Sequence, residues 1–217
     1  MFRTLTIAAT LSATTAATTA GAEQIGFTDW TEQRIKLLSS NDYTQGEDTL
    51  TFVSDNTISL LWTRLPESLS DATTASWDWA VRQSVPPTDL SVKGGDDRNI
   101  AVYFLWVPED VVPELEEAEI RSLIGRDDVR ILQYVWGGNN PVGEPIPSPY
   151  GNPETGVTIP LRQADTGSES VTVDLIADFA RAFGDREPGS LIGMAVSGDS
   201  DGTESLIEAE VSAVVVE

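Results

Sequence analysis

The 217-residue sequence contains no cysteine and no histidine. Without cysteine, disulfides and thiolate metal sites are excluded, so the fold must be held by its core or by a hard cation on oxygen ligands. Without histidine, Ser-His-Asp and Cys-His catalysis and His-ligated zinc are excluded, and the commonest general base is missing. The remaining chemistry rests on carboxylates, hydroxyls, amides and a few cations.

Positive charge is also scarce. Thirteen Lys and Arg residues face 35 Asp and Glu residues, for a formal net charge of −22, and only Lys36 and Lys93 are lysines. Such a surface repels nucleic acid and anionic membranes, so neither is an expected partner. Because salt screens self-repulsion, we expect the stability of the protein to rise as salt is added.

The first residues have the three parts of a secretory signal peptide. Arg3 supplies a positive start, residues 5–20 carry no charge, and Ala20-Gly21-Ala22 is a small-residue cleavage site. The alternative is a disordered polar tail. We expect cleavage after Ala22, hence a signal peptide over 1–22, no lipoprotein anchor, and a periplasmic or secreted protein. No later segment is apolar enough to predict a membrane span.

Short β-type runs with frequent Gly, Asn, Asp and Pro punctuation dominate the rest of the chain. Strands are expected at 50–54, 57–63, 75–82, 100–107, 129–136, 156–161, 171–174, 191–197 and 205–216. Two helical segments interrupt them, at 113–124 and 174–183. The pattern predicts one mostly β domain over 23–217, a sandwich with one or two short helices.

Aromatic residues suggest one candidate binding site. Trp77 and Trp79 share a face of their strand, as do Tyr134 and Trp136, and Trp136 opens into the proline-rich loop 137–152. Aromatic planes on a β-sandwich can stack on sugar rings. Packing in the core is the other interpretation, favoured for Trp77 and Trp79 and left open for Trp136. For a saccharide ligand the expected contacts are Trp136, Tyr134, Asn139, Asn140 and Asp97.

Segment 198–204, Gly-Asp-Ser-Asp-Gly-Thr-Glu, suggests a calcium site. Asp199, Asp201 and Glu204 place three carboxylates in six residues around a glycine, which suits Ca²⁺ and its oxygen ligands. The alternative is an acidic hairpin turn, where Asp and Gly are favoured in any case. The pair Asp96-Asp97, which precedes an apolar strand, has the same two readings: a cation ligand pair or a turn.

The order of several motifs resembles a bacterial exported family known as domain of unknown function three thousand and forty-seven. The motifs are Trp77-Asp78-Trp79, Gly94-Gly95-Asp96-Asp97, Leu132-Gln133-Tyr134-Val135-Trp136-Gly137, Ala182-Phe183-Gly184 and Asp199-Ser200-Asp201-Gly202-Thr203-Glu204. The resemblance implies a jelly-roll β-sandwich similar to carbohydrate-binding and galactose-binding-like domains, but no activity. Ala101 stands where the family has an arginine, and Arg98 is the nearest substitute.

Three functions follow from these observations. The first is a non-catalytic, exported glycan-binding protein, with Ca²⁺ as a candidate cofactor. The second is a hydrolase or lyase on the same scaffold, using two carboxylates or a tyrosine base, because one fold supports both binding and catalysis. The third is a structural envelope protein that binds a protein partner and no small ligand.

Overall fold

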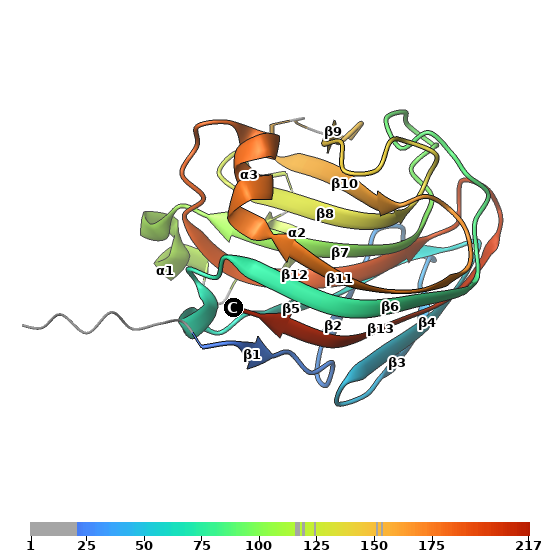
Figure 1. Cartoon of the computed structure of the whole chain (residues 1–217), viewed down its shortest axis with the longest axis horizontal. Helices are drawn as coiled ribbons and strands as arrows, with labels where there is room; N and C mark the ends of the chain where they lie inside the picture. The colour runs from blue at the N-terminus through green and yellow to red at the C-terminus, as the bar shows by residue number, and fades with distance from the viewer. Residues whose placement is uncertain (1–20, 116–117, 119, 124, 151, 153) are drawn as a thin grey trace, which may run out of the picture.

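The computed structural model describes residues 21–115, 118, 120–123, 125–150, 152 and 154–217. Within these residues, two β-sheets pack face to face, with short helices at one end (Figure 1). The prediction of a mostly β, jelly-roll sandwich is therefore confirmed. The predicted signal peptide falls almost wholly on residues outside the description, and its cleavage and the single domain over 23–217 stay predictions.

The six-stranded sheet has the order β11-β6-β13-β4-β3, and β1 also pairs with β13. Its strands are β1 (Glu23–Gln24), β3 (Asp42–Gln45), β4 (Thr49–Asp55), β6 (Thr74–Gln83), β11 (Gly167–Asp174) and β13 (Leu206–Val216). The seven-stranded sheet has the order β2-β5-β12-β7-β8-β10-β9. Its strands are β2 (Thr31–Arg34), β5 (Ile58–Arg64), β7 (Arg98–Val107), β8 (Arg130–Gly137), β9 (Ile146–Pro147), β10 (Gly156–Arg162) and β12 (Ser190–Asp199). Strands β8 and β10 are parallel.

All nine predicted strands have a counterpart. The strands that the sequence pattern missed are β1, β2, β3 and β9, which have two to four residues each. Runs this short carry too few alternations to show a period of two. Three of them, β2, β3 and β9, lie at sheet edges, where a strand needs only one neighbour.

The helices also follow the prediction in part. Asp174 is the N-cap of helix α3 (Leu175–Phe183), and its carboxylate accepts a hydrogen bond from the Ala177 backbone amide at 2.8 Å. Of the helix expected over 113–124, residues 116–117, 119 and 124 lie outside the description, and the described part has two short helices, α1 (Val112–Leu115) and α2 (Ile120–Leu123). Single 3₁₀ turns occupy Glu67–Leu69 and Glu109–Val111. Among the described residues, no helix is long and apolar enough to cross a membrane.

Strand β7 lies at the centre of the seven-stranded sheet and is buried along its whole length. One face, with Ile100, Val102, Phe104 and Trp106, packs into the core between the sheets. The other face, which includes Tyr103 and Leu105, belongs to a second apolar cluster with helix α2 and Leu90. Both faces of β7 are therefore covered. The candidate site lies on the face that points away from the core between the sheets.

Candidate functional site: a pocket with an acidic wall

A pocket of about 510 Å³ lies on the face of the seven-stranded sheet that points away from the core. Strands β5, β7, β8, β10 and β12 form its floor, and four loop segments, at 35–36, 90–97, 148–150 and 201–202, also line it. Its volume is in the range of small-molecule sites, roughly 300 to 1,000 Å³. The outward side chains of the central strands therefore decide what the pocket can bind.

One side of the pocket is mainly aliphatic and the other is mainly charged. The register pairs Leu105 with Ile131 and Ala195 with Tyr103, farther along the strands than the Arg98–Asp199 pair. Leu60 lies beside Ser197, and aliphatic Ile58 lies beside Asp199. Among the described lining residues, the charged ones are Lys36, Asp96, Asp97, Arg98, Asp199 and Asp201. Four carboxylates against two cations give this wall a net negative formal charge, which disfavours anionic ligands.

Arg98 is the centre of the charged side. Its Cα is paired across the ladder with that of Asp199, because β7 shifts register beside Arg98 in both of its ladders, with β12 and with β8. Its Nη1 donates to the Asp96 carbonyl at 2.6 Å and lies 3.1 Å from Asp199 Oδ2, while Nη2 donates to the Tyr103 hydroxyl at 2.8 Å. The Tyr103 hydroxyl is also 2.8 Å from Ser197 Oγ. The network fixes a buried guanidinium between β7 and β12.

The pKa values of Asp199 and Arg98 are both shifted in this network. Burial raises the pKa of Asp199 to about 7, Arg98 opposes that shift, and the neighbouring Asp97, Asp96 and Asp201 add to it. Burial disfavours the charge of Arg98, but nearby Tyr103 and the carboxylates outweigh it and raise the pKa of the guanidinium. Asp199 is only 2 % exposed, and its Oδ1 has no hydrogen-bond partner among the described residues. One buried acceptor therefore remains for a ligand.

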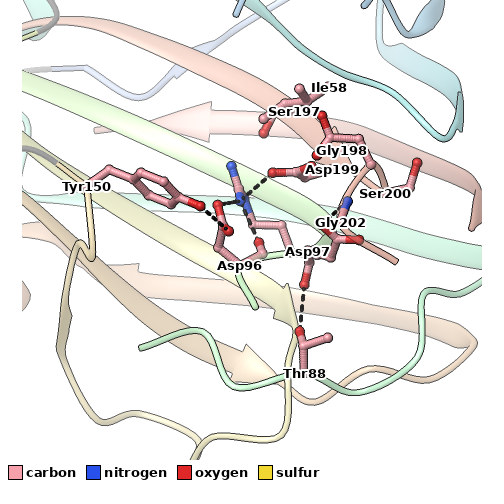
Figure 2. Close-up of polar contacts among 12 residues, drawn as sticks. Ile58, Thr88, Asp96, Asp97, Tyr150, Ser197, Gly198, Asp199, Ser200 and Gly202 are labelled. Atoms are coloured by element: carbon pink, nitrogen blue, oxygen red, sulfur yellow. Dashed lines mark hydrogen bonds and ion pairs between the residues drawn. The ribbon is translucent and has the colours of Figure 1, made fainter. Parts of the chain in front are cut away.

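Asp97 holds the turn after β12 in place. Its Oδ1 accepts from the Gly202 amide at 3.1 Å, and its Oδ2 accepts from the amide and hydroxyl of Thr203 at 2.7 and 2.5 Å. Figure 2 shows Asp97 and Gly202 facing each other beside Asp199. Because of this clamp, the turn that carries Asp201 is fixed by the protein itself.

Asp97, Asp199 and Asp201 form an acidic group in which one oxygen of each lies within 4.8 Å of the others. Two of the three predicted metal ligands, Asp199 and Asp201, are thus brought together. The third, Glu204, is exposed and lies outside this group. Asp97, predicted as a ligand contact, takes its place. The group could hold a metal ion.

The predicted aromatic platform is corrected by the structure. Tyr134 and Trp136 are fully buried, because their face of β8 points into the core between the sheets. The Tyr134 hydroxyl donates to Asp178, and Trp136 Nε1 donates to Asp165, each at 3.0 Å. Neither ring has a face free for a sugar, so for Trp136 the core interpretation holds. Trp77 and Trp79 lie in the same core, as expected.

The two predicted amide contacts support loops instead of the pocket. Asn140 accepts from the Leu90 amide at 2.8 Å and donates to Asp89 Oδ1 at 2.9 Å. The backbone amide of Asn139 donates to the Thr88 carbonyl at 2.7 Å. Neither Asn139 nor Asn140 lines the pocket, although both fix the loop that does.

The aromatic residue at the rim of the pocket is Tyr150. It is 48 % exposed, its hydroxyl donates to Asp96 Oδ1 at 2.9 Å, and it accepts from the Gly94 amide at 2.9 Å (Figure 2). The sequence placed Tyr150 in the proline-rich loop expected to carry function, but gave no reason to prefer it over Trp136. Its position in the middle of an irregular loop, and not in a strand, was the available signal.

Comparison with known families identifies the family to which the chain belongs. The family model described as "Protein of unknown function (DUF3047)" matches residues 28–215, which confirms the resemblance seen in the sequence. No curated protein sequence matches the chain.

Comparison with solved structures gives distant matches. The xyloglucanase domain of NopAA, a type three effector from Sinorhizobium fredii, is 12 % identical, with 87 % of this chain and 92 % of that chain covered and a TM-score of 0.46. A family 11 carbohydrate-binding module from Clostridium thermocellum is 8 % identical, with 92 % and 96 % covered and a TM-score of 0.40. The endo-1,4-β-glucanase CelB2 is 10 % identical, with 90 % and 93 % covered and the same score. The chain is thus distantly similar in structure to carbohydrate-binding modules and glycanases.

Proposed function

The chain belongs to the DUF3047 family, whose function is unknown, and we propose that it is an exported protein that binds a neutral saccharide, without catalysis, in the pocket over β7 and β12. The observation that carries the proposal is the lining of this pocket, which is aliphatic on one side and polar on the other. A sugar ring has the same two characters, with apolar C–H faces and a rim of hydroxyls. Export rests on the predicted signal peptide.

The polar side matches hydroxyl groups in particular. Asp199 Oδ1 can accept a hydrogen bond from a hydroxyl, and Arg98 has a buried Nε that also lacks a partner among the described residues. A hydroxyl can both donate and accept, so sugar hydroxyls can satisfy both atoms. The excess of carboxylates in the wall favours neutral saccharides over uronic acids or sulfated ones.

Tyr150 supplies the ring for stacking that Tyr134 and Trp136 cannot supply. Its hydroxyl is held by Asp96 and Gly94, so the ring is oriented before a ligand arrives. A side chain fixed in advance loses less conformational entropy on binding. We expect the sugar to lie between this ring and the aliphatic side of the pocket.

One observation favours hydrolysis as the second candidate. Asp199 Oδ2 and Asp96 Oδ2 lie 3.1 and 3.7 Å from the same Arg98 nitrogen, so they are at most 6.8 Å apart, the sum of the two distances. Glycosidases use carboxyl pairs separated by roughly 5 to 9.5 Å, one of them with a raised pKa. Release of reducing ends from a polymer on incubation with the protein would select this function over binding alone.

The test is calorimetric titration of neutral oligosaccharides, namely glucans, xylans, mannans and galactans, with an oligogalacturonate as the acidic counterpart. We expect Tyr150→Ala to weaken binding of the responding sugar by roughly two- to thirteenfold, as loss of an aromatic contact of about 0.5–1.5 kcal/mol implies. Tyr150→Phe, which keeps the ring, should lose less. Val142→Ala, an exposed change outside the pocket, is the control.

An absence of binding across the whole panel, by a protein that melts cooperatively, would contradict the proposal. Equal affinities of Tyr150→Ala and the parent protein would contradict the placement of the sugar. Export is tested separately, because mass spectrometry of the native protein should find a mature chain that begins at Glu23.

A further inference from the structure

We propose that Asp97, Asp199 and Asp201 hold a hard divalent cation, Ca²⁺, at the acidic end of the pocket. The inference goes beyond saccharide binding and does not need it, because all of the protein ligands are in place without a sugar. It also differs from the calcium site expected from the sequence, which used Glu204 and would have braced the turn after β12.

Charge at this end of the pocket matches a divalent ion. Four carboxylates, from Asp96 and the three ligands, surround only two cations, Arg98 and Lys36, among the described lining residues. The formal charge left over is −2. Asp97 and Asp199 are each 2 % exposed, so solvent screens this excess poorly.

A second observation points directly to a ligand. Asp199 lines the pocket, and while its Oδ2 pairs with Arg98, its Oδ1 has no partner among the described residues. A buried carboxylate oxygen without a donor costs folding free energy, so such atoms are rare in proteins. A cation between Asp199 Oδ1 and the oxygens of Asp97 and Asp201 would remove that cost.

A main-chain carbonyl oxygen, that of Gly94, lies at most 5.9 Å from Asp97 Oδ1, the sum of 2.8 and 3.1 Å. A Cβ placed on Gly202 would lie 2.8 Å from Asp97 Oδ1 and 3.1 Å from the Gly94 carbonyl oxygen. A main-chain carbonyl and carboxylates are the donors that Ca²⁺ prefers, and it takes six to eight oxygens. The remaining positions are open to water or to ligand hydroxyls. Because Asp97 already clamps the turn, the ligands are preorganised.

Lys36 is the internal competitor of the ion. Its Nζ lies 2.5 Å from Asp201 Oδ2, but its side chain is 64 % exposed and can leave the carboxylate at small cost. An exposed ion pair contributes at most about 1 kcal/mol, which corresponds to roughly a fivefold change in affinity. Replacement of Lys36 by an uncharged residue should therefore tighten ion binding by about that factor.

The experiment is calorimetric titration of chelator-treated protein with CaCl₂, MgCl₂ and ZnCl₂ in the absence of any saccharide. We expect one Ca²⁺ site per chain, bound about tenfold or more weakly by Asp201→Asn and about fivefold more tightly by Lys36→Met. Arg82→Met removes one positive charge from the exposed surface of β6, outside the pocket, and should leave the affinity unchanged.

Three results would overturn the proposal: no saturable Ca²⁺ binding, an unchanged affinity in Asp201→Asn, or equal effects of Lys36→Met and Arg82→Met, which would show only diffuse attraction to an acidic protein. A stronger response to Mg²⁺ or Zn²⁺ would overturn the choice of ion. Asp201 is partly exposed, so its variant should fold, and a melting curve checks this. Since no sugar is present, failure here leaves the saccharide proposal standing.

Discussion

Replacement of Arg98 by methionine tests whether the buried charge network holds the pocket together. Arg98 links β7 to β12 through Asp199, and to the outer face of β7 through Tyr103. Methionine has a similar length and no charge, so the change removes the guanidinium with little loss of volume. Asp199 would then lose its buried cationic partner, while three carboxylates that raise its pKa, those of Asp96, Asp97 and Asp201, remain nearby.

The expected loss is large because both partners are buried. The side chains of Arg98 and Asp199 are 10 % and 3 % exposed. Removing one partner of a buried ion pair costs about 3–5 kcal/mol, since the other charge is left without compensation. We expect a loss of that size in the free energy of unfolding of Arg98→Met at alkaline pH, where Asp199 is charged.

The loss should also depend on pH, with a definite sign. Arg98 holds down the pKa of Asp199, so its removal raises that pKa above the present value of about 7. When folding raises the pKa of a carboxyl, the protein loses stability as the pH climbs from the unfolded pKa to the folded pKa. The parent protein completes this loss near neutral pH, whereas Arg98→Met continues it at higher pH. The difference between them should therefore be larger at about pH 8.5 than at about pH 6.

Urea unfolding followed by tryptophan fluorescence measures both effects, since Trp77, Trp79 and Trp136 are buried in the core. Arg98→Lys keeps the positive charge but cannot reach both Asp199 and Tyr103 as the two guanidinium nitrogens do. It should therefore lose less free energy of unfolding than Arg98→Met. Arg82→Met breaks an exposed pair with Glu210 and should cost less than about 1 kcal/mol. A loss below about 1 kcal/mol for Arg98→Met, or a difference independent of pH, would refute the reasoning.

Three further changes have clear expectations. Asp199→Asn removes the ionisation that opposes folding, so between about pH 5 and pH 8 it should lose less stability than the parent, by up to roughly 3 kcal/mol, as urea titration at each pH would show. Gly198→Ala places a Cβ 2.4 Å from the Phe52 ring and should cost about 1–3 kcal/mol in the same assay. Asp174→Ala removes the cap that accepts from Ala177 and should lower stability by about 1 kcal/mol, as a reduced melting temperature.

Much of the fold was predictable because it depends on local patterns. Alternation in β6 put Trp77 and Trp79 on one face, and that face is the core face. Helix α3 was predicted from the spacing of Phe179 and Phe183 and the stop at Gly184. These signals need no knowledge of what the strand or helix packs against.

The site was harder to predict because both faces of the central sheet are buried. In β7, even-numbered residues from Ile100 to Trp106 point to the core, and odd-numbered residues such as Tyr103 point to the pocket. When both faces of a strand are apolar, the sequence shows which residues share a face but not which of the two faces packs in the core between the sheets. For β8 the same ambiguity made Tyr134 and Trp136 look available, when the pocket face of that strand carries Gln133.

The acidic wall depends on a contact that no local pattern contains. Arg98 and Asp199 are about a hundred residues apart, and they meet because the ladder between β7 and β12 shifts register at that point. Without the shift, period-two alternation would leave Arg98 on the same face as Ile100, which is in the core. A glycine at 198 is needed beside it, since Phe52 occupies the space of a side chain there. The irregularity in the strands therefore brings the cation and the carboxylates to the pocket, and the chemistry proposed for the pocket depends on that irregularity.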